Sequence, residues 1–164
     1  MQSAFDYYAK NNISVTWTLI CIGLDFLDYT YRIKVSEIKE YAMSLLNSGS
    51  SKDELIELLW IDDNSEGSIA SIIDKLKSKE SVDFDVERRK WVLYVLNSAI
   101  SNISMNANLF QLLELDDLYL YLGCPEHFPQ DMHNEDYAHC TNLNEMIIKH
   151  KVWIKNEISE LQKQ

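Results

Sequence analysis

The stretch that decides the fold reads DVERRKWVLYVLNSAIS over residues 85–101. Its apolar residues recur at spacings of three and four, which is the periodicity of a helix with one buried face. The residues that form or widen this face are Trp91, Val92, Tyr94, Val95, Leu96, Ser98 and Ala99. The pattern predicts a long central helix that begins at Asp83 or Asp85 and ends near Ser101.

The same spacing predicts shorter helices on both sides of the central one. These helices are expected within residues 4–10, 14–24, 36–47, 52–60, 66–76, 106–121 and 141–161. The residues expected to cap their first turns are Ser3, Ser14, Ser36, Ser51 with Glu54, and Thr141. Residues 25–34 fit either a helical extension or an extended connector.

Composition also favours an all-α fold. The chain of 164 residues has only four Gly and two Pro, whereas hairpin-rich β folds need many such turn residues. No segment alternates apolar and polar residues over the length of a strand. We therefore expect one all-α domain over residues 1–164, an irregular helical bundle or a short stack of helical hairpins with about seven to eight helices.

Negative charge dominates the chain and is unevenly placed. The formal net charge is −11, which disfavours nucleic acid and acidic membrane surfaces as partners because their phosphates repel the chain. Residues 91–148 and residues 53–73 contain no Lys or Arg. The bases gather elsewhere, at Lys75, Lys77, Lys79, Arg88, Arg89, Lys90, Lys149, Lys151 and Lys155. A basic protein is the partner that this field favours.

The longer base-free segment predicts a partner-binding face made of acids and aromatics. Its candidate residues are Glu114, Asp116, Asp117, Glu126, Phe128, Asp131, Glu135, Asp136 and Tyr137. Aromatic side chains anchor many protein interfaces. The alternative is a solvated acidic surface that only keeps the protein dispersed, with Tyr119 and Tyr121 in the core.

Cysteine and histidine residues gather in the region after residue 123. The weak candidates for zinc ligands are Cys124, His127, His133, His139 and Cys140. Zinc needs about four sulfur or imidazole ligands in a tetrahedral arrangement. His139 and Cys140 are adjacent, and adjacent side chains rarely point at one ion. We therefore expect ordinary loop residues, no metal and no cofactor.

Other patterns typical of ligand sites and active sites are incomplete. Asp62-x-Asn64-x-Glu66-Gly67 resembles the start of a calcium-binding EF-hand loop, but Ile73 stands where that site requires a bidentate Glu. A polar loop between two helices is expected instead. The chain has no phosphate-binding loop, no Gly-x-Ser-x-Gly and no His-Glu-x-x-His motif, and His150 fits an apolar core. We expect a protein that is not an enzyme.

Cysteine usage and the termini bear on the compartment. The three cysteines, Cys21, Cys124 and Cys140, do not form the spaced framework of a disulfide-rich secreted protein. The first residues lack the basic segment and apolar core of a signal peptide. The longest apolar stretch, residues 17–24, is far shorter than the roughly 20 residues of a membrane span. We expect a cytoplasmic protein.

Apolar landmarks and helix caps follow one another in a recognisable order. They are Trp17, Ile22-Gly23, Tyr41-Ala42, Leu45-Leu46, Gly49, Glu54-Leu55, Leu58-Leu59, Lys90-Trp91, Tyr94, Leu96, Tyr121-Leu122 and Pro125. In this order the chain resembles a family of uncharacterised small bacterial proteins, a domain of unknown function. The resemblance implies helix packing and no catalytic motif. In size and acidity the chain is also similar to immunity proteins of bacterial polymorphic toxin systems, which implies binding to a cationic toxin domain.

Three functions follow from these patterns. The favoured one is a binding protein that neutralises a basic partner, and it predicts a contiguous acidic surface with exposed aromatics. A helical adaptor or structural domain would instead expose an apolar patch of several hundred Å². A zinc-dependent or thiol enzyme would bring Cys124 and His127 together with a third residue, such as His133, around a pocket.

Overall fold

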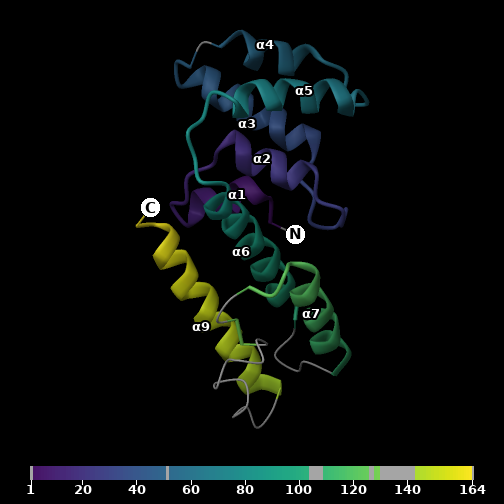
Figure 1. Cartoon of the computed structure of the whole chain (residues 1–164), viewed down its shortest axis with the longest axis vertical. Helices are drawn as coiled ribbons and strands as arrows, with labels where there is room; N and C mark the ends of the chain where they lie inside the picture. The colour runs from purple at the N-terminus through teal and green to yellow at the C-terminus, as the bar shows by residue number, and fades with distance from the viewer. Residues whose placement is uncertain (1, 51, 104–108, 126–127, 130–142, 164) are drawn as a thin grey trace. The chain divides into compact units, whose positions relative to one another are not determined.

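The computed structural model describes residues 2–50, 52–103, 109–125, 128–129 and 143–163. These residues form eight α-helices and contain no strand (Figure 1), which confirms the all-α prediction. The helices are α1 (Ala4–Lys10), α2 (Trp17–Leu24), α3 (Val35–Asn47), α4 (Asp53–Trp60), α5 (Glu66–Lys77), α6 (Phe84–Asn102), α7 (Leu109–Tyr121) and α9 (Leu143–Leu161).

The helices belong to two compact units. The first comprises Gln2–Trp91 and the second Val92–Gln164, so that α6 continues from one unit into the other. A single domain over the whole chain stays a prediction.

The first two helices begin at hydroxyl caps, one of them not the residue expected. Ser3 caps α1 as predicted, because its Oγ accepts a hydrogen bond from the backbone N–H of Asp6 at 3.1 Å. Thr16, and not Ser14, caps α2: its Oγ1 accepts from the backbone N–H of Leu19 at 3.0 Å. Thr16 directly precedes the first apolar turn, where an N-cap reaches the free N–H groups.

Two further helix starts also differ from the sequence prediction. Helix α3 begins at Val35, one residue before the expected cap Ser36, and the carboxylate of Glu37 accepts from the backbone N–H of Lys34 at 2.9 Å. Helix α4 begins at Asp53, and Glu54 pairs with Lys79 at 2.5 Å. The other member of that predicted capping box, residue 51, lies outside the described residues. The ion pair ties the start of α4 to the segment that follows α5.

Chain reversals occur where the sequence predicts them. Gly49 has φ of 94°, and the N–H groups of Gly49 and Ser50 donate to the carbonyls of Leu46 and Leu45, which closes α3 in a Schellman motif. Residues 25–34 contain no helix and turn at residues 29–31, so they form neither the helical extension nor the fully extended connector that the sequence allowed; Ile33 N–H donates to the Gly23 carbonyl at 3.1 Å.

Apolar helix faces build the core of the first unit. Helix α2 packs against α5, α3 against α4, and α4 against α5. The predicted inward residues of α5 are all buried: Ile69, Ile72, Ile73 and Leu76. Trp91 of α6 packs edge-on against Phe26, with ring centroids 5.8 Å apart.

The second unit contains the rest of α6 together with α7 and α9. Residues 92–96 are buried without interruption, so α6 is covered on every side there. Helix α7 ends at Tyr121, and Gly123 and Cys124 adopt positive φ angles of 82° and 55° before Pro125. The predicted break of the helix at this point is confirmed.

Candidate functional site

A buried ion pair lies at the start of α6. Lys90 Nζ and the Glu87 carboxylate are 2.7 Å apart, and the two residues are only 4% and 3% exposed. They stand three positions apart on the helix, a spacing that sequence reasoning takes for a surface pair. Lys90 follows the exposed Arg88 and Arg89 in the sequence, but its own ammonium is buried.

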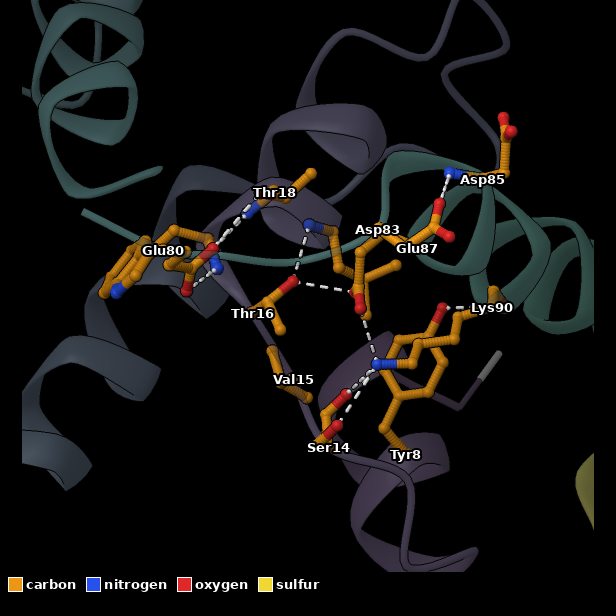
Figure 2. A network of polar contacts seen from close by, with 12 residues as sticks. Tyr8, Ser14, Val15, Thr16, Thr18, Glu80, Asp83, Asp85, Glu87 and Lys90 are labelled. Carbon is orange, nitrogen blue, oxygen red and sulfur yellow. Dashed lines mark hydrogen bonds and ion pairs between the residues drawn. The ribbon is translucent and has the colours of Figure 1, made fainter. Parts of the chain in front are cut away.

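The connection between α1 and α2 supplies the other partners of this pair (Figure 2). Lys90 Nζ also donates to the Ser14 carbonyl and to Ser14 Oγ, both at 3.1 Å. Thr16 Oγ1 donates to the second carboxylate oxygen of Glu87 at 2.7 Å. The three ammonium protons therefore meet three acceptors, and both carboxylate oxygens are engaged.

The same region contains a second carboxylate that holds α2. Glu80, in the segment between α5 and α6, accepts from the backbone N–H groups of Trp17 and Thr18 at 2.8 and 3.0 Å. These N–H groups lie at the positive end of α2, where a carboxylate is stabilised. Figure 2 shows Glu80 and Glu87 on either side of Thr16.

This network is a structural clamp. The donors and acceptors tie segments more than 60 residues apart in sequence. A buried pair of this kind resists disruption because removal of one partner leaves an unpaired charge.

The shorter acidic segment, residues 53–73, does not form a free acidic face. Four of its carboxylates pair with bases from other segments: Arg32 with Glu66, Lys39 with Asp63, Lys75 with Glu57, and Lys79 with Glu54. In the folded protein, bases from other segments therefore offset much of the negative charge of residues 53–73. Within the described residues, the candidate acidic face is reduced to α7.

Helix α7 has one buried side and one exposed side. Leu115, Tyr119 and Leu122, at its end, are buried. The opposite side, here called the α7 outer face, comprises Phe110, Leu113, Glu114, Asp117, Leu120 and Tyr121. At 100° per residue these six side chains fall within an arc of about 120°. Its four apolar members are 49–77% exposed.

The three acids of α7 have no basic partner among the described residues. No ion pair joins Glu114, Asp116 or Asp117 to a Lys or Arg anywhere in the described part of the chain. Two apolar pairs, Phe110 with Leu113 and Leu120 with Tyr121, flank them along the helix. Sequence reasoning identified the acids but not the exposure of Phe110, Leu113 and Leu120, because leucine-rich helices usually turn such residues inward.

The predicted face residues within the described part of the chain differ in exposure. Glu114 and Asp117 are exposed and Asp116 is half-buried. Phe128 is a correction: its ring is completely buried, stacked on Tyr119 at 5.6 Å between centroids, so it cannot be an exposed anchor in this structure. The remaining candidates, Glu126, Asp131, Glu135, Asp136 and Tyr137, lie outside the described residues.

His150 belongs to the same aromatic cluster and is the core histidine that the sequence predicts. Its ring lies 4.8 Å from that of Phe128, and Trp153 packs against Phe128 from 4.9 Å. Nδ1 of His150 is 2.6 Å from the Met146 carbonyl. Burial lowers the pKa of His150 to about 4, although the hydrogen bond to Met146 opposes the shift. The imidazole is therefore neutral at physiological pH.

Thiols and carboxylates elsewhere show no reactive arrangement in the described residues. No group of three or more His, Cys, Asp or Glu side chains there is placed to hold a metal ion. Cys124 is exposed, whereas the other zinc candidates, His127, His133, His139 and Cys140, lie outside the described residues. Absence of a metal therefore stays a prediction. Burial raises the pKa of the Cys21 thiol, which disfavours the reactive thiolate.

The loop that resembles an EF-hand is closed by its own hydrogen bonds. One Asp62 carboxylate oxygen accepts from the backbone N–H and the side-chain amide of Asn64, at 2.8 and 2.9 Å. These bonds lower the pKa of Asp62. The segment leads into α5 at Glu66, as expected for a polar loop between helices.

Comparison with known proteins places the chain in a family. No curated protein and no solved structure matches it. No helix in the described ranges combines the length and apolar character that a membrane crossing requires. A family model described as "Uncharacterized protein conserved in bacteria (DUF2247)" matches residues 5–158. Because this match covers nearly the whole chain, the protein belongs to that family.

Proposed function

We propose that this protein is a non-catalytic protein-binding domain that captures a basic protein through the α7 outer face. One observation carries the proposal: four exposed apolar side chains surround two carboxylates that have no basic partner among the described residues. Exposed apolar patches with a polar rim are typical of interaction sites.

The two chemical components have different roles in such an interface. The carboxylates attract and orient a cationic partner, and long-range steering can raise association rates by about 10–10³ fold. The apolar pairs lose water on contact and contribute to the lifetime of the complex. A face with both components favours a basic partner that also presents apolar side chains.

The size and net charge of −11 suit an immunity-type inhibitor that blocks a basic toxin domain in the cytoplasm. Half-buried Cys21 and exposed Cys124 are both free thiols, which is compatible with a reducing compartment. A helical adaptor that uses the same face for a different partner is the alternative, and partner identity distinguishes the two.

Affinity capture from cells of the source bacterium tests the proposal. The bait is wild-type protein, Asp117→Lys, or Glu40→Lys, and captured proteins are identified by mass spectrometry at low and high salt. Glu40 is an exposed acid on α3, so its reversal changes the net charge by the same amount as reversal of Asp117. We expect one basic protein that wild type and Glu40→Lys retain at low salt and that Asp117→Lys loses. Equal capture by all three baits would contradict the proposal.

A further inference from the structure

Helix α9 also exposes a row of apolar and charged side chains. The charged ones are basic, whereas those of the α7 outer face are acidic. The α9 outer face comprises Ile148, Lys151, Val152 and Lys155, all exposed. These four side chains fall within an arc of about 100°. No ion pair joins Lys151 or Lys155 to an acid in the described part of the chain.

Both outer faces have the spacing of helices that pack side by side. Phe110, Leu113, Asp117 and Leu120 follow one another at intervals of three, four and three. Ile148, Lys151 and Lys155 follow at three and four. This spacing keeps the named residues on one side of each helix, where a second helix could lie against them.

The charged groups of the two faces are also matched in spacing. Glu114 and Asp117 are separated by about 4.5 Å along the axis of α7, and Lys151 and Lys155 by about 6 Å along α9. Lysine side chains are flexible enough to span that difference. The apolar residues beside each charged pair, such as Leu113 and Val152, would then meet one another.

The two faces do not cover each other within one chain. Both are exposed, and the buried sides of α7 and α9 contact Phe128 through Tyr119 and through His150 and Trp153. Pairing of the outer faces therefore requires a second copy. The net charge of −11 opposes self-association, but distant charges are screened beyond about 8 Å at physiological salt, whereas the facing acids and lysines lie in contact.

We propose that a second copy of this chain covers the α7 outer face with its own α9 outer face. The functional consequence of this contact rests on the proposed function. Self-association masks the α7 outer face until a basic partner displaces the second copy. The protein's own lysine stripe thus imitates the partner.

Sedimentation equilibrium over about a hundredfold range of protein concentration, at physiological salt, tests this inference. We expect wild type and Glu40→Lys to form dimers with the same dissociation constant. Asp117→Lys and Lys155→Glu should each weaken the dimer by at least about tenfold. The combined reversal of both faces (Glu114→Lys, Asp117→Lys, Lys151→Glu and Lys155→Glu) should restore it to within about threefold of wild type, because the opposite charges meet again.

Two results would overturn the inference. One is a wild-type protein that stays monomeric over the whole concentration range. The other is a dimer that neither single reversal weakens. Loss of the basic partner from Asp117→Lys in affinity capture would still support the proposed function in either case, so the two proposals fail separately.

Discussion

At the scale of single residues, the Glu87–Lys90 ion pair of the first unit is buried and hydrogen-bonded on both sides. Every proton of the Lys90 ammonium has an acceptor, and water is nearly excluded. Such a pair is costly to break from one side, because the remaining charge stays buried without compensation. Its contribution differs in kind from that of the exposed pairs on α3, α4 and α5.

Truncation of one partner should show this difference. Lys90→Met is expected to lower the free energy of unfolding by about 3–5 kcal/mol, as measured by urea denaturation at neutral pH. Lys75→Met is the control, because its partner Glu57 is 3.7 Å away and both side chains are about half exposed; its effect should stay below about 1 kcal/mol. Similar losses in the two variants would show that the buried pair has no special role.

His150 should make stability depend on pH. The unfolded chain takes up a proton near the ordinary pKa of 6.5, whereas the folded protein does so only near 4. Stability from this group is therefore complete above pH 6.5 and declines as the pH falls toward 4. At pH 5 the loss relative to pH 7.5 should be about 2 kcal/mol greater in wild type than in His150→Gln. Urea denaturation at the two pH values measures it, and parallel losses in both proteins would exclude His150 as the cause.

At the scale of elements, one glycine sets how closely α2 approaches α6. A Cβ on Gly23 would lie 2.5 Å from Ile33 Cδ1 and 2.6 Å from Trp91 Cζ3. Both neighbours are buried and cannot move aside freely. The close approach explains why a glycine stands at position 23, in the last turn of α2.

Two alanine substitutions with opposite expected signs test this explanation. Gly23→Ala should destabilise the protein by about 1–3 kcal/mol through overpacking. Gly67→Ala, on α5, meets nothing within 4 Å and should stabilise it by about 0.5–1 kcal/mol through the higher helix propensity of alanine. Thermal unfolding of both variants gives the comparison. A neutral or stabilising Gly23→Ala would mean that α2 and α6 can separate without cost.

Helix positions and buried faces could be predicted from the sequence because both follow from local periodicity. The isoleucines of α5 and the turn at Gly49 are examples. Several caps could not be predicted, because their partners come from distant segments: Glu80 holds the start of α2, and Lys79 takes the carboxylate of Glu54. The acids of the α7 outer face could be identified from the sequence, because they lie in a segment without Lys or Arg. The exposure of Phe110 could not, because it depends on what packs against the helix.

At the scale of the whole molecule, net charge alone does not identify the binding surface. The acids of residues 53–73 are mostly paired with bases from other segments, so they add little outward field. The acids of α7 have no such partners in the described residues. The field therefore differs between the two segments, although both lack Lys and Arg. This difference, and not the total of −11, points to α7.

The central claim is that the α7 outer face binds a basic protein through both its acids and its apolar side chains. The measurement that tests it most directly is surface plasmon resonance of the captured partner against wild type, Asp117→Lys, Leu120→Ser and Trp60→Ser. Trp60 is the control, because it is an exposed apolar residue on α4, at 85%. Asp117→Lys should mainly slow association and reduce its dependence on salt, whereas Leu120→Ser should mainly speed dissociation.

We predict that Trp60→Ser leaves both rate constants within about twofold of wild type, while the two α7 variants each weaken binding by about tenfold or more. Partner binding that is lost in Trp60→Ser and unchanged in Leu120→Ser and Asp117→Lys would contradict the account, because the binding surface would then lie on α4.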